Sequence, residues 1–299
     1  MILNIYVIYA LMAAICVGSS DFLSRFTSGK YSSLYPALWV TGIGSMLLGG
    51  ILYIQGHEFF TLDSVTLTMM GIAGFLNLLS LILFYHALYR QPISIASPIC
   101  TLSTAFLAVE WAIFGIELAM PVYIGMILSV LGAGLIGFFS DKTNATFTFK
   151  HNLITAMFAL CAAVCFSLRL FILQHYVPTV GATESLFYAR FFSFLIAIII
   201  LIYCMKRNKI KLPKIRGFNL LHDGGIPIIQ GLCETVGILL LLNASVGQYR
   251  VIAPAIFTCY CLVTIILSVI FLQERLKLGR IIAIFILLLG VVIMQIFGN

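Results

Sequence analysis

The stretch Phe271-Leu-Gln-Glu-Arg-Leu-Lys-Leu-Gly279 joins two long apolar segments through a short charged turn, and a weaker copy of it occurs earlier in the chain. The earlier copy, Phe114-Gly-Ile-Glu117, has the same Phe and Glu three residues apart and also leads into an apolar segment. Small residues follow in both, namely Gly132 and Gly134 after the first copy and Gly290 after the second. The two copies stand 157 residues apart, about half of the 299-residue chain. This spacing predicts an internal duplication.

The composition predicts a membrane protein. The chain is 62% hydrophobic and only 9% charged, whereas a soluble domain has about 25% charged residues. Apolar runs of roughly 20 residues recur along it, and each is long enough to cross a hydrocarbon core of about 30 Å as a helix. The net charge of +7 comes mostly from short loops between these runs, so it indicates topology and not nucleic-acid binding. We therefore expect an integral, multi-pass protein of the bacterial inner membrane with the lipid bilayer as its surroundings.

The predicted fold class is an all-α polytopic membrane protein with ten transmembrane helices. We expect residues 1–140 to form the first five-helix repeat, 141–151 a linker, and 152–299 the second repeat, all within one membrane domain. Five spans per repeat is an odd number, so the second repeat must enter the membrane from the opposite face, as in many secondary transporters. The predicted spans cover residues 2–23, 34–54, 65–88, 93–115, 120–139, 152–176, 183–205, 224–246, 251–272 and 278–297.

Aligning the halves pairs several polar residues. Ala13-Ala-Ile-Cys16 matches Ala162-Ala-Val-Cys165, and the same register places Trp39 on Tyr188. After an eight-residue expansion of one loop, Asn77 falls on Glu234 and His86 on Asn243. One charge therefore breaks the two-fold symmetry at the Asn77 and Glu234 positions.

The sequence resembles the EamA-type branch of the drug/metabolite transporter superfamily over nearly its whole length. The residues that carry the resemblance are Phe271-Leu-Gln-Glu-Arg-Leu276 with the helix after it, the copy at 114–139, and Tyr188-Ala-Arg190-Phe. The resemblance implies ten helices around a central substrate cavity, with spans one to four and six to nine lining it and spans five and ten outside. It also implies secondary transport of small organic solutes. The chain departs from the family at Val17-Gly18-Ser-Ser20, where Trp-Gly is frequent, and at Thr41 of span two, where span seven keeps an arginine.

Three ionisable residues inside predicted spans are candidate substrate-binding residues. A charged group at the centre of a membrane helix costs about 2.5–3.5 kcal/mol on insertion scales, so it must be paired or face a wet cavity. Arg169 and Arg190 are expected at one level, and Glu234 is near the middle of span eight. A guanidinium suits a carboxylate or phosphate, and a buried Glu can exchange a proton, so Glu234 is also the candidate coupling residue. The alternative is a structural role, in which Glu110 or Glu184 neutralises an arginine.

Other residues are candidates for the wall of the cavity or for its gates. Asn77, Trp39, Tyr85, Tyr188 and Tyr260 could line it, although interfacial belts also use aromatic residues. As gate or hinge residues we consider the four near span ends, Pro98, Pro254, His86 and Asn243. Asp21 is expected to form an interfacial pair with Arg25, and Glu117 and Glu274 to act in helix-end turns.

These residues predict a secondary active transporter of a small polar organic solute, such as an amino acid or a similar zwitterionic or anionic metabolite. It would work by alternating access, with proton coupling or exchange. The alternatives are an exporter of drugs or organic cations with the same fold, or a channel or receptor without a pumping cycle. No catalytic set, Walker-type loop or metal-ligand spacing stands out, so we expect no enzyme activity, cofactor or metal. The expected partners are the small-molecule substrate and a second copy in a homodimer, and not nucleic acid.

The distribution of basic residues predicts the orientation. Fourteen Lys and Arg residues flank the spans on one side, including six between Lys206 and Arg216, and only Arg250 lies on the other. Cytoplasmic loops carry the excess of positive charge, which places both termini outside the cytoplasm. Many members of the family that the chain resembles have cytoplasmic termini, and we follow the charge count.

A reporter protein that works only in the cytoplasm tests this orientation. Fused after Asn299 it should be inactive, whereas a truncation fused after Lys211 should be active and serves as the control. Strong activity of the Asn299 fusion would contradict the assignment.

Overall fold

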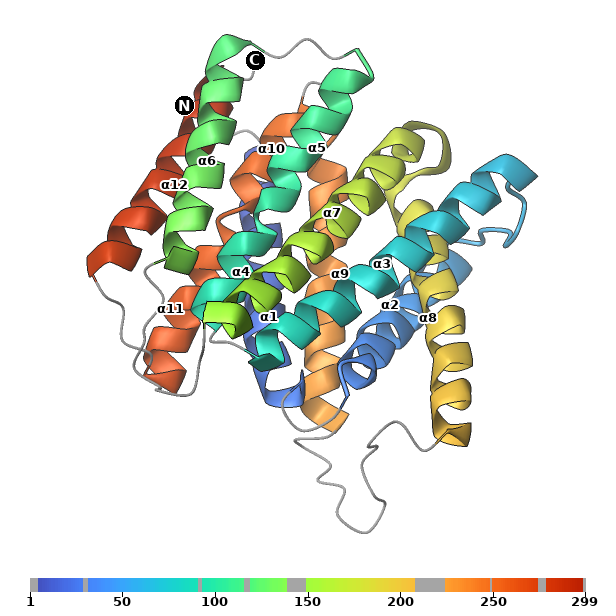
Figure 1. Cartoon of the computed structure of the whole chain (residues 1–299). Coiled ribbons are helices and arrows are strands. Elements are labelled where there is room, and N and C mark those ends of the chain that lie inside the picture. The colour runs from blue at the N-terminus through green and yellow to red at the C-terminus, as the bar shows by residue number, and fades with distance from the viewer. Residues whose placement is uncertain are drawn as a thin grey trace.

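The computed structural model describes residues 5–28, 32–90, 93–115, 119–138, 149–207, 224–247, 249–273 and 278–297. All regular secondary structure in these ranges is helical (Figure 1). The helices are α1 (Ile5–Ser28), α2 (Leu34–Ile54), α3 (Ser64–Arg90), α4 (Ile93–Cys100), α5 (Leu102–Ile113), α6 (Met120–Phe138), α7 (Phe149–Val180), α8 (Ala182–Lys206), α9 (Ile226–Ala244), α10 (Tyr249–Phe257), α11 (Tyr260–Leu272) and α12 (Leu278–Phe297).

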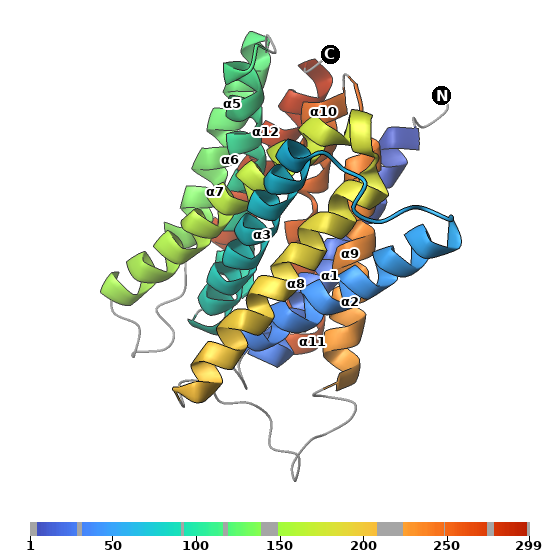
Figure 2. The ribbon, with the colours of Figure 1, turned by 90° about the vertical axis from the view of Figure 1, so that its right-hand side faces the viewer.

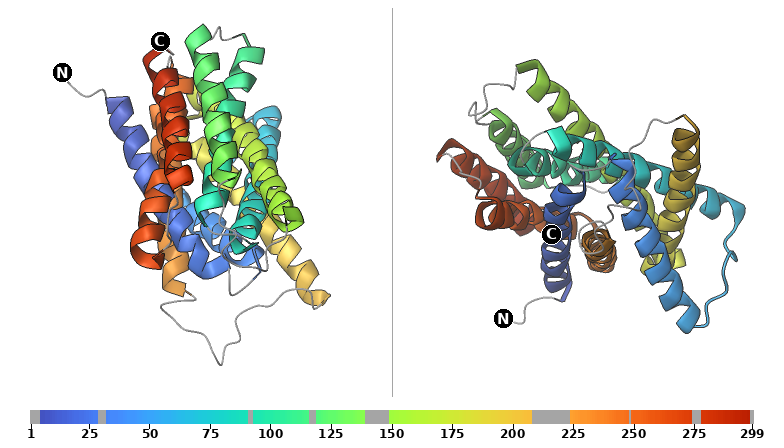
Figure 3. Two further views of the ribbon diagram at one scale, coloured as in Figure 1. Left: turned by 60° about the vertical axis from the view of Figure 1, so that its left-hand side comes forward. Right: turned by 90° about the horizontal axis from the view of Figure 1, so that it is seen from below.

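The predicted fold class is confirmed. Eight segments are long and apolar enough to cross a membrane, and two of them contain a break, so that α4 with α5 and α10 with α11 each make one crossing. The two remaining apolar helices, α6 and α12, are 19 and 20 residues long, and with them the described residues contain ten apolar helical segments. The start of α1 and the end of α12 lie at one end of the bundle, and the end of α8 lies at the other (Figure 3).

Spans four and nine, in which Pro98 and Pro254 are the hinge candidates, are each broken near the middle in the structure. Each contains a proline as the sixth residue of its first helical piece, Pro98 in α4 and Pro254 in α10. Proline has no N–H and its ring collides with the carbonyl four residues earlier, which weakens the helix. The breaks follow at Thr101 and Thr258, whose hydroxyls donate 2.6 Å hydrogen bonds to the carbonyls of Pro98 and Ala255. These threonines stand 157 residues apart, as Asn77 and Glu234 do, so the two breaks occupy matching positions of the duplicated halves.

The helices α6 and α12 lie side by side at one edge of the bundle, as Figures 1 and 2 show. Glycines let their backbones approach. A Cβ atom on Gly132 would stand 2.4 Å from the backbone nitrogen of Leu287, and one on Gly290 would stand 2.4 Å from the carbonyl oxygen of Gly125. Small residues promote such close helix packing in membranes. The small residues after the two repeated motifs therefore hold spans five and ten against each other.

The loop between α2 and α3 is attached to α8 at the end of the bundle where the chain begins. The backbone N–H of Phe60 donates a 2.8 Å hydrogen bond to the Tyr188 hydroxyl, and His57 Nε2 lies 3.2 Å from a carboxylate oxygen of Glu184. Asp63 begins α3 by accepting hydrogen bonds from the backbone N–H groups of Val65 and Thr66. The hydrogen bonds from Thr66 lower the pKa of Asp63, because they favour its charged form.

The close approach of α6 and α12 predicts a steric cost at Gly132. Changing Gly132→Ala should lower the stability of the protein by about 1–3 kcal/mol, because the added methyl group meets backbone that cannot rotate away. Gly71→Ala is the matched control, since a Cβ there has no atom within 4 Å. Thermal unfolding in detergent compares the two, and equal midpoints would show that the glycine packing contributes little.

Candidate functional site

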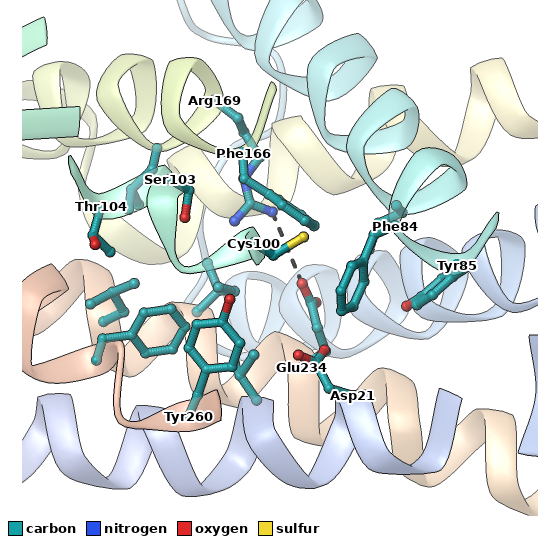
Figure 4. Close-up of a pocket in the computed structure, with 16 residues that line it drawn as sticks. Asp21, Phe84, Tyr85, Cys100, Ser103, Thr104, Phe166, Arg169, Glu234 and Tyr260 are labelled. Carbon is teal, nitrogen blue, oxygen red and sulfur yellow. Dashed lines mark ion pairs between the residues drawn. The ribbon is translucent and has the colours of Figure 1, made fainter. Parts of the chain in front are cut away.

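A cavity lies between the two halves of the chain, with an empty volume of about 610 Å³ that includes its opening (Figure 4). The first half lines it from α1, α3, α4 and α5, and the second half from α7, α9, α10 and α11. Residues on both sides of the two helix breaks belong to this lining, including Cys100, Ser103 and Tyr260. Six of the eight spans expected to line a cavity do so. Spans two and seven, which are α2 and α8, contribute no lining residue.

An ion pair between α8 and α9 contains the most buried charged residue of the site, Arg190. Arg190 is fully buried and Glu234 is 5% exposed, and Nη2 of Arg190 contacts Oε2 of Glu234. The arginine side chain passes over Gly44 of α2, where an added Cβ would stand 3.3 Å from its Cδ. Glu234 borders the cavity, while Arg190 is not among its lining residues. Arg190 therefore neutralises Glu234 without reaching the cavity itself.

Arg169 of α7 lines the cavity and is 3% exposed. Its Nη1 lies 4.0 Å from Oε1 of Glu234 and donates a hydrogen bond to Oδ1 of Asn77. Its guanidinium also stands 5.4 Å from the centroid of the Phe166 ring. Nε of Arg169 has no hydrogen-bond partner among the described residues. Because the closer partner of Glu234 is Arg190, Arg169 keeps positive charge that a ligand could use.

Asn77, the repeat mate of Glu234, orients Arg169 from behind the cavity. Its Nδ2 donates a 2.9 Å hydrogen bond to the Ser193 hydroxyl. That hydroxyl has one hydrogen to donate, and its two acceptors in reach are the carbonyl oxygens of Gly74, at 2.6 Å, and Ala189, at 2.8 Å. A chain of hydrogen bonds thus connects α3, α7 and α8 at the level of the ion pair.

Two predicted aromatic residues, Tyr85 and Tyr260, do line the cavity. Tyr85 is fixed, because its hydroxyl accepts a 2.9 Å hydrogen bond from Nε2 of Gln230, and Gln230 accepts one of 3.1 Å from Thr27. The hydroxyl of Tyr260 has no such partner among the residues described.

The structure places the other candidates away from this cavity. Trp39 packs edge-on against Tyr35, and Tyr188 binds the loop between α2 and α3. His86 packs against the Phe158 ring, with centroids 4.8 Å apart. Asn243 is exposed and its amide donates to the carbonyl of Leu239 in its own helix. These four residues are not brought together with Arg169 and Glu234.

Sequence reasoning assigned the acidic partners incorrectly. Neither Glu110 nor Glu184 neutralises an arginine of the site: Glu184 pairs with His57, and Glu110 has a buried oxygen without a partner among the described residues. Asp21, expected at the interface beside Arg25, instead lines the cavity and is 7% exposed. The sequence did not predict this position, because Asp21 lies late in α1 and only the packing of the helices shows that this turn faces the cavity. Glu117 and Glu274 lie outside the described residues.

Comparison with known proteins gives a consistent result. The EamA-like transporter family matches the sequence twice, over residues 4–138 and 153–296. A solved crystal structure of a protein is similar at a TM-score of 0.68, covering 95% of this chain and 97% of its own, with 13% identity. At that identity the similarity extends to the fold alone. No curated protein matches the sequence.

The geometry predicts different roles for the two arginines. Arg190→Gln leaves Glu234 without its close partner, and removing one member of a buried pair costs about 3–5 kcal/mol. Glu234→Gln should also destabilise, because two buried arginines lose their acid. The double variant Arg190→Gln/Glu234→Gln should cost less than the sum of the two changes. Unfolding of the four proteins in detergent measures this coupling, and strictly additive effects would contradict the pair.

Proposed function

Because the chain belongs to the EamA-like transporter family, we propose that it is a secondary active transporter of a small polar organic solute that carries charge. An amino acid or a similar zwitterionic or anionic metabolite is the proposed class. The solute would bind in the cavity between the halves and cross the membrane by alternating access. This is the way in which a pair of inverted repeats presents one site to the two faces in turn.

The observation that carries the proposal is the position of the charged groups in the fold. Arg169 and Glu234 border a cavity to which both repeats contribute, beside two helix breaks. Discontinuous helices at a repeat interface commonly form the substrate site of secondary transporters, because the break frees backbone polar groups. A purely structural ion pair has no need of such a cavity.

Arg169 is the proposed anchor for an anionic group of the solute. It faces the cavity, it is held from behind by Asn77, and its Nε has no hydrogen-bond partner among the described residues. A guanidinium presents a planar set of donors that matches a carboxylate. Burial strengthens such a contact, since little water competes for it.

Glu234 is the proposed coupling residue, and its contacts suggest how. In the pair with Arg190 its charged form is stabilised, while Arg169 at 4.0 Å is a second, weaker partner. A solute anion on Arg169 would change the potential at Glu234. Any loss of the Arg190 contact in another conformation would then favour protonation, because burial penalises an unpaired carboxylate.

The second candidate function is export of organic cations, which the aromatic lining favours. Rings of Phe84, Tyr85, Phe166 and Tyr260 border the cavity, and aromatic faces attract cations. Arg169 opposes it by repelling a ligand that is only positive. Solutes of different charge therefore separate the two candidates.

Counterflow in proteoliposomes tests the solute class. Proteoliposomes preloaded with an unlabelled amino acid should take up the same amino acid in labelled form. The Arg169→Gln variant should lose at least about tenfold in apparent affinity, since one charged contact is worth about 1.5–3 kcal/mol. Phe75→Leu, on an exposed face away from the cavity, is the control. Uptake of lipophilic cations alone would favour the second candidate, and equal affinity in well-folded Arg169→Gln would remove this residue from the site.

An imposed pH gradient tests the coupling role of Glu234. Glu234→Gln is less stable by the argument above, so the charge-balanced variant Arg190→Gln/Glu234→Gln is measured beside it. Both should still exchange solute but fail to concentrate it in response to the gradient. If either folded variant accumulates solute with the pH dependence of the wild type, then Glu234 does not carry the coupling proton.

A further inference from the structure

Asp21 is a buried acid that takes no part in the ion pair of Arg190 and Glu234. It lies on α1, is 7% exposed, and borders the same cavity as Arg169. In Figure 4 its side chain enters from α1, on the side of the cavity opposite to Arg169 of α7. The first repeat thus supplies the acid Asp21 to this cavity, and the second repeat supplies Arg169 together with Glu234.

The carboxylate of Asp21 has no hydrogen bond or ion pair with any residue that the structure describes. The neighbouring Arg25, its expected partner, instead donates to the backbone carbonyl of Leu88. The hydroxyl of Ser24 reaches only the backbone oxygen of Asp21. Burying a carboxylate without a partner is costly. A ligand that brings a positive charge to this wall of the cavity would remove that cost and stabilise the ionised form of Asp21.

The surroundings of Asp21 suit an ammonium group. Tyr85 and Tyr260 line the cavity with it, and the Tyr85 hydroxyl is held by Gln230, which fixes the ring. Aromatic rings attract a cation electrostatically, while the unpartnered hydroxyl of Tyr260 can accept a hydrogen bond from it. Among the residues lining the cavity, Arg169 is the one basic side chain, so no other cation of the lining competes with a ligand for Asp21.

We propose that Asp21 binds the ammonium group of the solute, on the side of the cavity opposite to the Arg169 site for its carboxylate. This rests on the proposed function and narrows its solute class to zwitterions with a primary or secondary amine. With all four groups ionised, the charges of Asp21, Arg169, Arg190 and Glu234 sum to zero. A zwitterion adds no net charge to this balance, whereas a simple anion or cation does.

Ligand-induced thermal stabilisation of the purified full-length protein tests the ammonium site, because a ligand that binds the folded state raises its unfolding temperature with concentration. The probes are the standard L-amino acids, the deaminated acid of each, and the decarboxylated amine of each. For Asp21→Asn we expect at least about tenfold weaker binding of the zwitterion and the amine, with unchanged binding of the deaminated acid. For Arg169→Gln we expect the reverse, in that the acid and the zwitterion weaken and the amine does not.

Two further variants separate recognition from folding. Asp21→Glu keeps the charge and should keep the preference for the amine over the deaminated acid. Asp63→Asn removes a carboxylate from the exposed loop before α3 and should change neither preference nor affinity. Unfolding without ligand establishes that each variant is folded.

The outcomes distinguish the two levels of the proposal. If wild type binds zwitterions and Asp21→Asn binds them equally, or weakens acid and amine alike, the ammonium site is overturned while the transported class stands. If wild type binds the deaminated acids or lipophilic cations but no zwitterion, both the zwitterionic class and the role of Asp21 are overturned.

Discussion

The buried contact between Arg190 and Glu234 is the constraint on which the rest of the site depends. Neither charge can be left alone in the apolar interior of a membrane protein, so α8 and α9 are tied together wherever the pair persists. The pair places Glu234 at the cavity and keeps Arg190 behind it. It also determines which charges remain for a ligand. Glu234 has Arg190 as its close ionic partner, whereas Arg169 and Asp21 are charged groups of the cavity lining without a close partner of opposite charge.

Glycine and proline create the space around these charges. Gly44 leaves room for the Arg190 side chain to reach α9, and Gly132 and Gly290 let α6 and α12 pack together away from the cavity. Pro98 and Pro254 lie just before the two breaks whose flanking residues form part of the cavity wall. The duplication thus contributes two related breaks, but the two halves carry different charges. Glu234 of the second half corresponds to the neutral Asn77 of the first. Because the two halves share the helix breaks but differ in charge, the two sides of the cavity can bind different groups of a solute.

The sequence predicted the architecture well because length and apolarity of a segment largely determine a membrane helix. Arg169, Glu234, Tyr85 and Tyr260 were also found at the cavity, since a charge or hydroxyl in an apolar span needs a polar environment. The partners were not predictable. Periodicity cannot show that Arg190 reaches Glu234 across Gly44, or that Asp21 turns inward while Trp39 and Tyr188 do not. Those facts depend on how helices rotate and tilt against each other, which packing determines. The proline breaks had a signal in Pro98 and Pro254, but proline is tolerated in many membrane helices.

The most direct test of this account is an experimental structure of the protein with a bound solute, using the amino acid that stabilises it most. The account predicts solute density in the cavity between the halves, with its carboxylate in contact with Arg169 and its ammonium in contact with Asp21. The contact between Arg190 and Glu234 should remain intact if the helices are arranged as in the present structure. Solute bound outside this cavity, or held by Arg190 after the pair has separated, would contradict it.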